Sequence, residues 1–438
     1  MKVLVVSQPV FSNTNNMGKT LKGYFKKFDP SEIAQLYFRK GTPKDVSSCE
    51  NYYSFSDEDA IISIIKRNHY GKRFCKEEIK RQNAEKVIRE PQEEAIDKIY
   101  KIKSKHKAWV LIIRDFLRSL SAWKNKELLN WIEEMDPDLL FFAAGDMIFS
   151  YEIVRYLAIH LKKPLVIVCL DDFYINNRNK YDFLGEIRQK RFLKTVKKTM
   201  DHTAALFTIC DSMNRAYTEL FHKKCYTLYT SAEDKKLVLN QEASQISYIG
   251  NIGCGRCQSL LQIGEALSKL EGAEYPKYID VYSGSNHMEC IEMLKNGVGV
   301  RFHGAISENQ VLEVMSNSMA VIHTESFEKE MMDRVRFSVS TKIAESLMYG
   351  PCMIAYGPEG IASIDYLKEN HAAYVISSPE GLAEKLKEFF DQQSIRENIL
   401  KNARLLAHKN HDDDINPKKV REWIQEIVDC NGKESTKV

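Results

Sequence analysis

Short apolar runs alternate with longer amphipathic runs along the whole chain. Most of the short runs are continuously apolar, which is typical of strands that are covered on both faces. The predicted strands are residues 2–7, 34–38, 139–144, 165–170, 204–209 and 225–230 in the first half, and residues 246–250, 278–283, 300–303, 320–323, 352–356 and 373–376 in the second half. Helical patterns lie between them, for example at residues 148–161, 259–270, 309–315 and 381–390.

This alternation of strands and helices predicts βαβ units and parallel sheets, and therefore an α/β protein. Twelve strands in one open sheet would be unusual, so two doubly wound domains fit the pattern better. A length of 438 residues also favours two or three domains. The boundary is predicted in the polar stretch at residues 231–244, which precedes a new strand.

Composition narrows the class of protein. With 44% hydrophobic and 28% charged residues, the chain is an ordinary globular sequence, which rules out a disordered, collagenous or disulfide-scaffold protein. A net charge of +3 is too small to indicate a nucleic-acid partner. Ten irregularly spaced cysteines are expected to be reduced, as in a cytoplasmic protein. No apolar stretch approaches the ~20 residues of a membrane span, which does not exclude association with a membrane surface.

One segment stands apart in charge. Residues 61–126 contain 18 Lys and Arg against 8 Asp and Glu, and they end in an apolar run at 109–113 followed by Phe116, Leu117, Leu120 and Trp123. We slightly favour a solvated helical insertion whose apolar face packs on the first domain. The alternative is a surface that meets anionic lipid.

Several familiar motifs are incomplete. Cys254 and Cys257 have the spacing of a redox or zinc pair, but no second pair or nearby histidine accompanies them. We rank such a role below the alternative, in which Arg256 and the loop amides at a helix N-terminus face an anion. Gly18 precedes a Lys-Thr pair, yet Asn13 stands where a phosphate-binding P-loop needs glycine.

The most informative stretch is residues 336–360. Ser340 and Thr341 open a short predicted helix that carries Lys342 and Glu345 and ends at Gly350. A polar helix N-terminus with a lysine suits a phosphate. The glutamate, one turn into the helix, could accept two hydrogen bonds from a ribose diol.

The run Ser-Thr-Lys-Ile-Ala-Glu-Ser-Leu-x-x-Gly-Pro at residues 340–351 resembles the nucleotide-sugar signature of the GT-B glycosyltransferases, specifically the retaining group called glycosyltransferase group 1. Residues 247–251 with Arg256 are similar to that family's first C-domain strand and diphosphate loop, and residues 300–304 resemble its base-binding turn. The N-terminal half resembles the family more weakly, at residues 137–141, 170–173 and 208–213, and residues 53–126 match nothing in it.

The resemblance implies two Rossmann-like doubly wound domains that face each other across a cleft. Residues 1–235 would bind the acceptor and carry a basic helical insertion near 60–126. Residues 245–405 would bind the nucleotide sugar, and residues 406–438 would form a C-terminal helix that returns to the N-domain. Such enzymes usually need no metal, because basic side chains and helix N-termini stabilise the leaving diphosphate. No cofactor is expected either, since the nucleotide sugar is a substrate.

The resemblance also assigns roles to single residues. Glu345 matches the ribose-binding glutamate, Arg256 a cation that binds the diphosphate, and Gly304 the base turn. Gly18 stands where an N-domain glycine loop approaches the phosphates. The remaining donor-binding positions are Gly250, Thr341 and Lys342.

Two positions depart from the family pattern. The first acid of the family's E-x7-E motif would fall on Phe337, whereas Glu325 has the right local context but lies twenty residues before Glu345. An inserted loop at residues 328–337 would explain the difference, and Glu325 is then expected to bind the transferred sugar. Asp146 stands where relatives often place a sugar-contacting histidine. It could bond a sugar hydroxyl or cap the following helix, with equal weight.

The favoured function is a glycosyltransferase that moves a sugar from a nucleotide diphosphate donor to an acceptor hydroxyl, with retention of configuration. We expect a sugar or lipid-linked acceptor, a part in polysaccharide or glycolipid biosynthesis, and a cytoplasmic chain that can sit peripherally on the inner face of the membrane. Two alternatives remain open. One is a nucleotide-sugar 2-epimerase on the same fold, and the other is a non-catalytic partner subunit, suggested by the lost E-x7-E spacing.

Overall fold

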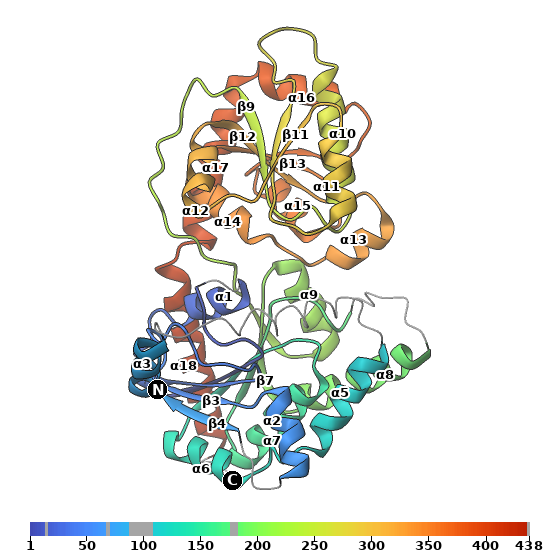
Figure 1. Cartoon of the computed structure of the whole chain (residues 1–438). Helices are drawn as coiled ribbons and strands as arrows, with labels where there is room; N and C mark the ends of the chain where they lie inside the picture. The colour runs from blue at the N-terminus through green and yellow to red at the C-terminus, as the bar shows by residue number, and fades with distance from the viewer. Residues whose placement is uncertain (14–15, 67–70, 87–107, 176–182, 436–438) are drawn as a thin grey trace. The chain divides into compact units, whose positions relative to one another are not determined.

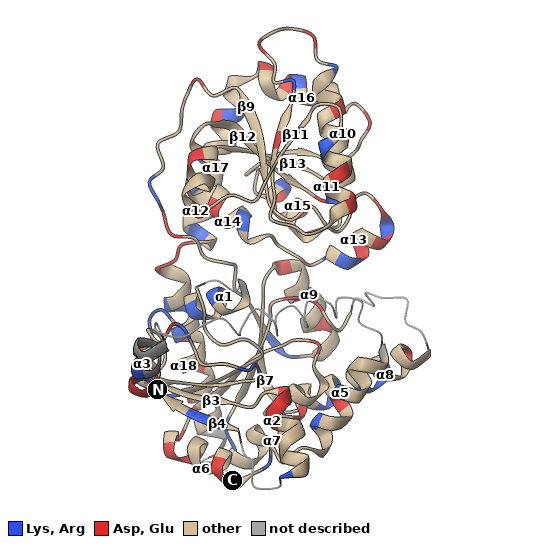
Figure 2. Cartoon of the chain, viewed as in Figure 1, with Lys and Arg blue, Asp and Glu red and all other residues tan. Residues whose placement is uncertain are grey.

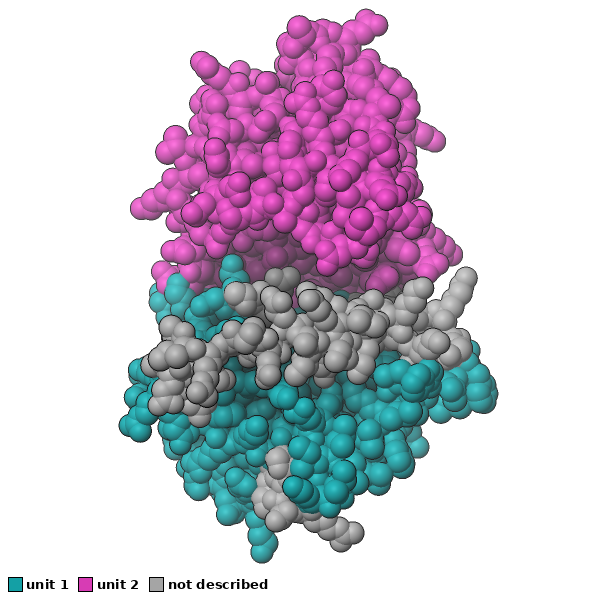
Figure 3. All heavy atoms as spheres, in the orientation of Figure 1, with its two compact units in different colours: residues 1–208, 214–227, 417–438 teal, residues 209–213, 228–416 magenta. Residues whose placement is uncertain are grey.

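The computed structural model describes residues 1–13, 16–66, 71–86, 108–175 and 183–435 (Figure 1). Its contacts divide the chain into two compact units, coloured separately in Figure 3. The first unit comprises residues 1–208, 214–227 and 417–438, and the second comprises residues 209–213 and 228–416. The sequence-based domains end at residue 235 and begin again at 245. The contact-based division instead places the whole segment from 228 to 416 in the second unit.

The first unit contains an eight-stranded sheet in the order β4-β3-β2-β1-β5-β6-β7-β8. Its strands are β1 (Val3–Ser7), β2 (Ile33–Tyr37), β3 (Asn51–Ser54), β4 (Lys72–Cys75), β5 (Leu139–Ala143), β6 (Leu165–Cys169), β7 (Thr203–Thr208) and β8 (Lys224–Thr227). All neighbours are parallel except β3 and β4, which pair antiparallel. The strand order reverses between β1 and β5, so the sheet is doubly wound, as predicted. β3 and β4 were not among the predicted strands.

The helices of the first unit are α1 (Asn16–Tyr24), α2 (Asp57–Ile65), α3 (Lys76–Lys86), α5 (Ala108–Leu120), α6 (Lys126–Met135), α7 (Ile148–Leu161), α8 (Phe183–Met200), most of α9 (Asp211–Phe221) and α18 (Ile415–Ser435), with a 3₁₀ turn at Pro30–Glu32. Trp423 of α18 packs against Phe207 and Tyr226, with ring centroids 5.7 and 4.8 Å apart. The C-terminal helix thereby covers β7 and β8 of the first unit.

The basic insertion predicted near residues 60–126 includes α2, β4, α3 and α5 in its described parts, while residues 67–70 and 87–107 lie outside the description. The favoured interpretation, in which its apolar face packs on the domain, holds for part of the predicted apolar run. Leu111, Ile112 and Leu117 are partly buried and Trp123 is buried, whereas Trp109, Ile113, Phe116 and Leu120 are exposed. The charged side chains Asp115 and Arg118 occupy part of the buried face of α5.

The second unit contains a fully parallel six-stranded sheet in the order β11-β10-β9-β12-β13-β14. Its strands are β9 (Gln245–Ile249), β10 (Ile279–Tyr282), β11 (Val300–Gly304), β12 (Ser318–Thr324), β13 (Cys352–Tyr356) and β14 (Tyr374–Ile376). All six were predicted from the sequence. The helices are α10 (Arg256–Ser268), α11 (Met288–Lys295), α12 (Glu308–Ser316), α13 (Lys329–Val335), α14 (Thr341–Tyr349), α15 (Ala362–Glu369), α16 (Leu382–Asp391) and α17 (Gln393–Asn410).

Apolar residues fill both faces of this second sheet. Along β12, Ala320 and Ile322 pack into one core with α10 and α16, whereas Val321 packs into another with α12, α14 and α17. The alternation follows from the two-residue period of a strand. Because helices cover both faces of the sheet, a ligand can reach it at the loops that follow the strand ends.

Neither a segregated charged surface nor a disulfide bond distinguishes one described unit from the other. Acidic and basic residues are spread over the described helices of both units (Figure 2). All ten cysteines are free. Within the described ranges, no helix has the length and apolar character that crossing a bilayer would require.

Candidate donor site

The predicted donor-binding residues gather at the carboxyl edge of the six-stranded sheet. β9 and β12 are neighbours, and the chain winds outward from them in opposite directions. This reversal creates the crevice in which doubly wound sheets bind ligands. Gly250 directly follows β9 and Glu325 directly follows β12, so both residues lie at this point.

Arg256 and Glu325 form a bidentate ion pair across the reversal. The Arg256 Nε donates to Glu325 Oε2 at 3.0 Å, and its Nη2 donates to Oε1 at 2.7 Å. The Glu325 side chain is 1% exposed and the Arg256 side chain 17%. A fork-to-fork pair of this kind fixes both side chains. The sequence assigned Arg256 to the diphosphate and Glu325 to the sugar. In the structure, each is also the other's partner.

Glu325 is held from several sides. Its backbone N–H donates to the Tyr356 carbonyl at 3.0 Å, and its own carbonyl accepts from Ser259 Oγ at 2.9 Å. Burial raises the pKa of Glu325, although the Arg256 charge opposes this shift. Burial lowers the pKa of Arg256, but the charge of Glu325 and its hydrogen bonds outweigh this effect, and the net shift is upward. The two short contacts have the geometry of a bidentate arginine–carboxylate pair.

A neutral histidine, which the sequence analysis missed, lies beside this pair. His323 is buried, its Nε2 lies 2.9 Å from Ser363 Oγ, and the same atom is 3.9 Å from Glu325 Oε1. Burial, reinforced by the Arg256 charge, lowers the pKa of His323 to about 3. His323 is thus uncharged at neutral pH and is not a second cation for Glu325. His323 falls within a predicted strand, so the sequence pattern indicated a core residue there and not a neighbour of the site.

The loop between β9 and α10 needs glycine at its last position. Gly255 has φ +75°, and a Cβ atom there would lie 2.4 Å from Ser326 Oγ. The loop therefore packs directly on the turn that follows Glu325. The N–H groups of Arg256 and Cys257 donate to loop carbonyls, at 3.3 and 3.2 Å. Because these two N–H groups already have acceptors, the Arg256 side chain is the main group with which this turn can bind an anion.

The helix α14 supplies the second group of predicted residues. Ser340 caps it by accepting from the N–H of Lys342 at 3.3 Å. Lys342 Nζ donates to Glu345 Oε2 at 2.6 Å, with side chains 39% and 24% exposed. Thr341 is exposed at the first helical position. As α14 connects parallel β12 and β13, its N-terminus also lies at the carboxyl edge.

Gly304 ends β11 at the same edge. Its φ is +79°, and an added Cβ atom would meet no atom of the described residues within 4 Å. Close by, Tyr282 and His303 stack with centroids 4.6 Å apart, and His303 Nε2 lies 2.7 Å from Asp280 Oδ1. The predicted base turn is therefore an open left-handed corner beside an aromatic pair.

Two predicted residues belong to the first unit. Gly18 lies on α1, where an added Cβ atom would be 2.7 Å from the Val10 carbonyl, so glycine permits a close backbone approach. Asp146 is exposed after β5, and its carbonyl accepts from Arg188 Nη2 at 2.8 Å. The residue that caps α7 is Met147, without a side-chain hydrogen bond. The Asp146 carboxylate is therefore not the helix cap that one interpretation expected.

The cysteine pair does not behave as a reactive site. Cys257 is buried, and burial, together with the nearby Cys290 thiol, raises the pKa of its thiol to about 12. A thiol of this kind is a poor nucleophile and a poor metal ligand. In the described part of the chain, no cluster of three or more His, Cys, Asp or Glu side chains could hold a metal ion.

The geometry thus places Gly250, Arg256 and Glu325 at the reversal between β9 and β12, with Arg256 and Glu325 in contact. Thr341, Lys342 and Glu345 lie on α14 at the same edge of the sheet, with Lys342 and Glu345 in contact. Phe337, at the position of the family's first acid, is buried, and its carbonyl accepts from Cys210 Sγ at 3.5 Å. The short helix α13 fills most of the insertion between Glu325 and Phe337.

Comparisons with known proteins agree with this architecture. A family model described as glycosyl transferase-like matches residues 263–414. No curated protein sequence matches the chain. The Anabaena protein HepE (Alr3699), solved in complex with UDP, is 10% identical with a TM-score of 0.64, over 97% of this chain and 100% of that chain.

Two further solved structures are similar. The α,α-trehalose-phosphate synthase of Burkholderia xenovorans is 9% identical with a TM-score of 0.58, over 98% of this chain and 100% of that chain. WaaG, a glycosyltransferase involved in lipopolysaccharide biosynthesis, is 12% identical with a TM-score of 0.53, over 95% of this chain and 98% of that chain. At such identities these likenesses establish the fold. Together with the family match in the second unit, they confirm the predicted resemblance: the chain has the GT-B fold, and its residues 263–414 are similar to a glycosyl transferase-like family.

Proposed function

We propose that the chain transfers a sugar from a nucleotide diphosphate donor to an acceptor hydroxyl, and that the second unit binds the donor. The observation that carries this proposal is the clustering of Arg256, Glu325 and the polar N-terminus of α14 at the strand reversal of a doubly wound sheet. A buried cation and a helix N-terminus at such an edge suit an anionic ligand. The match of residues 263–414 to a glycosyl transferase-like family supports the reaction class.

In this proposal the Arg256 guanidinium binds the diphosphate, and Glu325 fixes the orientation of that guanidinium. A guanidinium has five N–H donors, and Glu325 accepts from two of its nitrogens, so other donors remain for phosphate oxygens. These donors would stabilise the negative charge that develops on the leaving diphosphate. Lys342 would add a second positive charge at the N-terminus of α14. The proposal includes no metal ion and no cofactor.

Glu345 is assigned to the ribose. Its carboxylate accepts one hydrogen bond from Lys342 and is partly exposed, so it retains oxygen lone pairs for two hydroxyl groups. Gly304 would place the base against an open backbone corner. A uridine diphosphate sugar is the first donor to test, because the HepE structures contain UDP, UDP with glucose, or UDP-glucose.

The finer assignments rest on the family resemblance, on a similar solved structure and on surface residues of the first unit. Retention of configuration comes from the family resemblance at residues 340–351. A lipid-linked or sugar acceptor, a role in polysaccharide or glycolipid biosynthesis and a peripheral position at the inner face of the membrane are supported by the fold shared with WaaG and by the exposed apolar residues of α5. In the first unit, Asp146 would bind the transferred sugar and Gly18 would approach the phosphates.

One observation favours a second candidate, a nucleotide-sugar-binding subunit without activity. Phe337 occupies the position of the first acid, and Glu325 is already paired with Arg256. Slow hydrolysis of the donor separates the two candidates. A transferase releases nucleoside diphosphate from a nucleotide sugar over time, whereas an inert subunit binds the donor and leaves it intact.

Glu345→Gln tests the donor site. An amide accepts poorly from both ribose hydroxyls, and losing hydrogen bonds to a charged acceptor costs about 1.5–3 kcal/mol, or roughly ten- to more than a hundredfold in affinity. Calorimetric titration of UDP and other nucleoside diphosphates measures this loss.

Glu265→Gln is the matched control. Glu265 lies on α10 and forms an intrahelical pair with Lys269 at 2.7 Å, roughly two and a half turns beyond the first residue of the helix. This variant should bind nucleotide like the parent chain. Equal affinities for the Glu345→Gln variant and the parent would remove Glu345 from the site.

A further inference from the structure

The helix α5 buries two charged side chains and exposes a stripe of large apolar ones, while its remaining apolar residues Leu111, Ile112 and Leu117 are partly buried. Asp115 and Arg118 are only 4% and 2% exposed. Trp109, Ile113, Phe116 and Leu120, spaced three or four residues apart, form one stripe in which each side chain is about half exposed. A helix on the surface of a water-soluble domain normally has the reverse arrangement.

Ion pairs on the buried side hold the helix in this orientation. Arg118 Nε donates to Asp57 Oδ1 of α2 at 2.7 Å, and its Nη1 donates to the Phe55 carbonyl at 2.8 Å. Asp115 accepts from Arg188 Nε of α8 at 2.7 Å. Rotating the stripe inward would break both buried pairs and leave charges without partners, which is strongly unfavourable. The exposure of the stripe is therefore built into the fold.

The apolar surface continues onto the neighbouring helix α8. Phe183, Leu184 and Ile187 are exposed in its first turns. Further along α8 the sequence carries six Lys and Arg against one Glu. Large apolar side chains beside a cationic helix are typical of surfaces that enter the headgroup region of an anionic membrane. We call the exposed residues Trp109, Ile113, Phe116, Leu120, Phe183, Leu184 and Ile187 the α5 surface.

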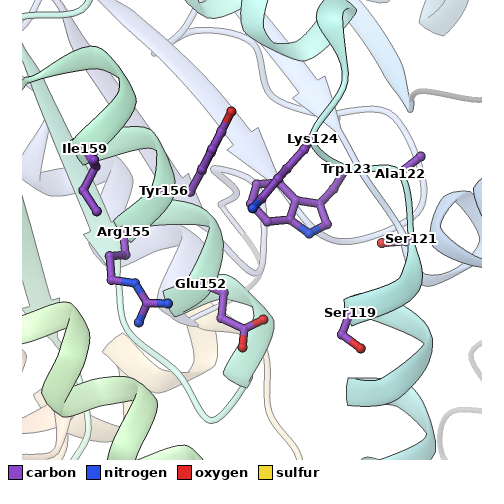
Figure 4. A pocket seen from close by; sticks show the side chains of 9 residues that line it. All are labelled: Ser119, Ser121, Ala122, Trp123, Lys124, Glu152, Arg155, Tyr156 and Ile159. Atoms are coloured by element: carbon purple, nitrogen blue, oxygen red, sulfur yellow. The ribbon is translucent and has the colours of Figure 1, made fainter.

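A hollow of about 490 Å³ lies at the end of α5, between α5, the loop at residues 121–124 and α7 (Figure 4). Lys124 Nζ lies 5.1 and 4.6 Å from the ring centroids of Trp123 and Tyr156. The Nη1 atom of Arg155 is buried and has no hydrogen-bond partner among the residues that the structure describes. Glu152, the carboxylate that lines the hollow, lies 3.6 Å from Arg191 Nη2. The hollow therefore offers two cationic groups to an anion.

We propose that the α5 surface docks on an anionic lipid bilayer and that the hollow binds a headgroup phosphate through Lys124 and Arg155. Lys124 and Arg155 both line the hollow, and a phosphate oxygen is a strong acceptor for ammonium and guanidinium N–H groups. The half-exposed tryptophan and phenylalanine suit the membrane interface, where apolar rings leave water. The proposal deepens the membrane partner named under the proposed function, but it does not depend on donor binding.

Sedimentation of the full chain with two kinds of vesicle tests the proposal. Vesicles of phosphatidylcholine mixed with phosphatidylglycerol should bind at least about tenfold more tightly than vesicles of phosphatidylcholine alone, and high salt should remove the difference. Trp109→Ser combined with Phe116→Ser should weaken this binding about tenfold or more. Val238→Ser combined with Val298→Ser, at exposed positions of the second unit, is the matched control and should change nothing.

A second pair of measurements distinguishes the contribution of the hollow to vesicle binding from that of the apolar stripe. Lys124→Gln combined with Arg155→Gln should lower binding to anionic vesicles to the level of neutral ones. Trp109 is the most exposed described tryptophan, so vesicles should shift the fluorescence of the parent chain to the blue but not that of the Trp109→Phe variant, which still sediments with them.

Three outcomes overturn the proposal. Equal binding to neutral and anionic vesicles excludes the charge-assisted site. Self-association that Phe116→Ser abolishes, without vesicle binding, assigns the surface to a second copy of the chain. Stabilisation by glycerol 3-phosphate without vesicle binding assigns the hollow to a soluble phosphate. The nucleotide affinity of the α5 variants should equal that of the parent chain, and Glu345→Gln should still bind vesicles, so the membrane and donor proposals fail separately.

Discussion

Arg256 and Glu325 show how a binding side chain can also be a structural one. Glu325 is buried and its partner nearly so, and removing one member of such a pair costs about 3–5 kcal/mol because the other charge is left without compensation. Arg256→Gln should therefore lower the free energy of unfolding by about this amount, besides weakening the binding of nucleoside diphosphate. Urea denaturation of the parent chain and the variant measures the loss.

The double variant Arg256→Gln with Glu325→Gln is the control. Two amides can hydrogen-bond without burying a charge, so the double variant should be more stable than the single Arg256 variant. If the two substitutions instead add, the ion pair seen at 2.7 and 3.0 Å contributes little in solution.

The sequence predicted both residues as parts of the site but not their pairing. Sixty-nine positions separate them along the chain, and they meet only because β9 and β12 are neighbours in the sheet. Sheet order is a long-range property that no local motif contains. His323 was concealed for a related reason, because a histidine within an apolar run is more often a core residue than a neighbour of a ligand.

At the scale of elements, the continuous apolar runs predicted every parallel strand except β3. That strand reads Asn-Tyr-Tyr-Ser and has no aliphatic run, although Tyr52 and Tyr53 are fully buried. β4 reads Lys-Arg-Phe-Cys and is an edge strand, where charged residues protect the open side of a sheet. The orientation of α5 was equally hidden, since an amphipathic pattern defines two faces but not which of them is buried.

The turn that opens α10 yields a prediction at this scale. Gly255→Ala forces a Cβ atom to 2.4 Å from Ser326 Oγ and 2.7 Å from Ser326 Cβ, in a left-handed backbone conformation. The strain of the conformation costs about 1–2 kcal/mol, and the clash should add about 1–3 kcal/mol more. Because the loop packs on the turn after Glu325, nucleotide affinity should fall as well. Thermal unfolding and calorimetric titration measure the two effects.

Gly381→Ala separates strain from the clash. Gly381 has φ +67°, and its added Cβ atom would meet only Glu384 Oε2, at 3.8 Å. This variant should lose only the conformational contribution and keep its nucleotide affinity. Equal losses of stability in the two variants would mean that the contact between Gly255 and Ser326 is loose in solution.

At the scale of the whole molecule, the described chain consists of two doubly wound units, and each should unfold with its own transition. The second unit contains two buried, neutral histidines, His323 and His411. His411 Nδ1 lies 2.7 Å from the Thr230 carbonyl, and its Nε2 lies 2.9 Å from the Tyr366 hydroxyl. Burial lowers the pKa of His411 to about 4, although the hydrogen bond to Thr230 opposes this shift.

This arrangement predicts that the second unit loses stability in mild acid. Below pH ~6.5 the unfolded chain protonates both histidines, whereas the folded unit keeps them neutral down to about pH 4 for His411 and about pH 3 for His323. The unfolded state therefore binds more protons throughout this window, and stability falls as the pH falls. Each histidine should contribute a loss of about 2 kcal/mol between pH 7 and pH 5. Calorimetric scans at several pH values should show the transition of the second unit moving to lower temperature as the pH falls.

In the His411→Gln variant, whose amide can still bond Thr230 and Tyr366, about half of this pH dependence should disappear even if the variant is less stable at pH 7. An unchanged slope would mean that His411 is protonated in the folded unit and that its contact with Tyr366 is not the one described.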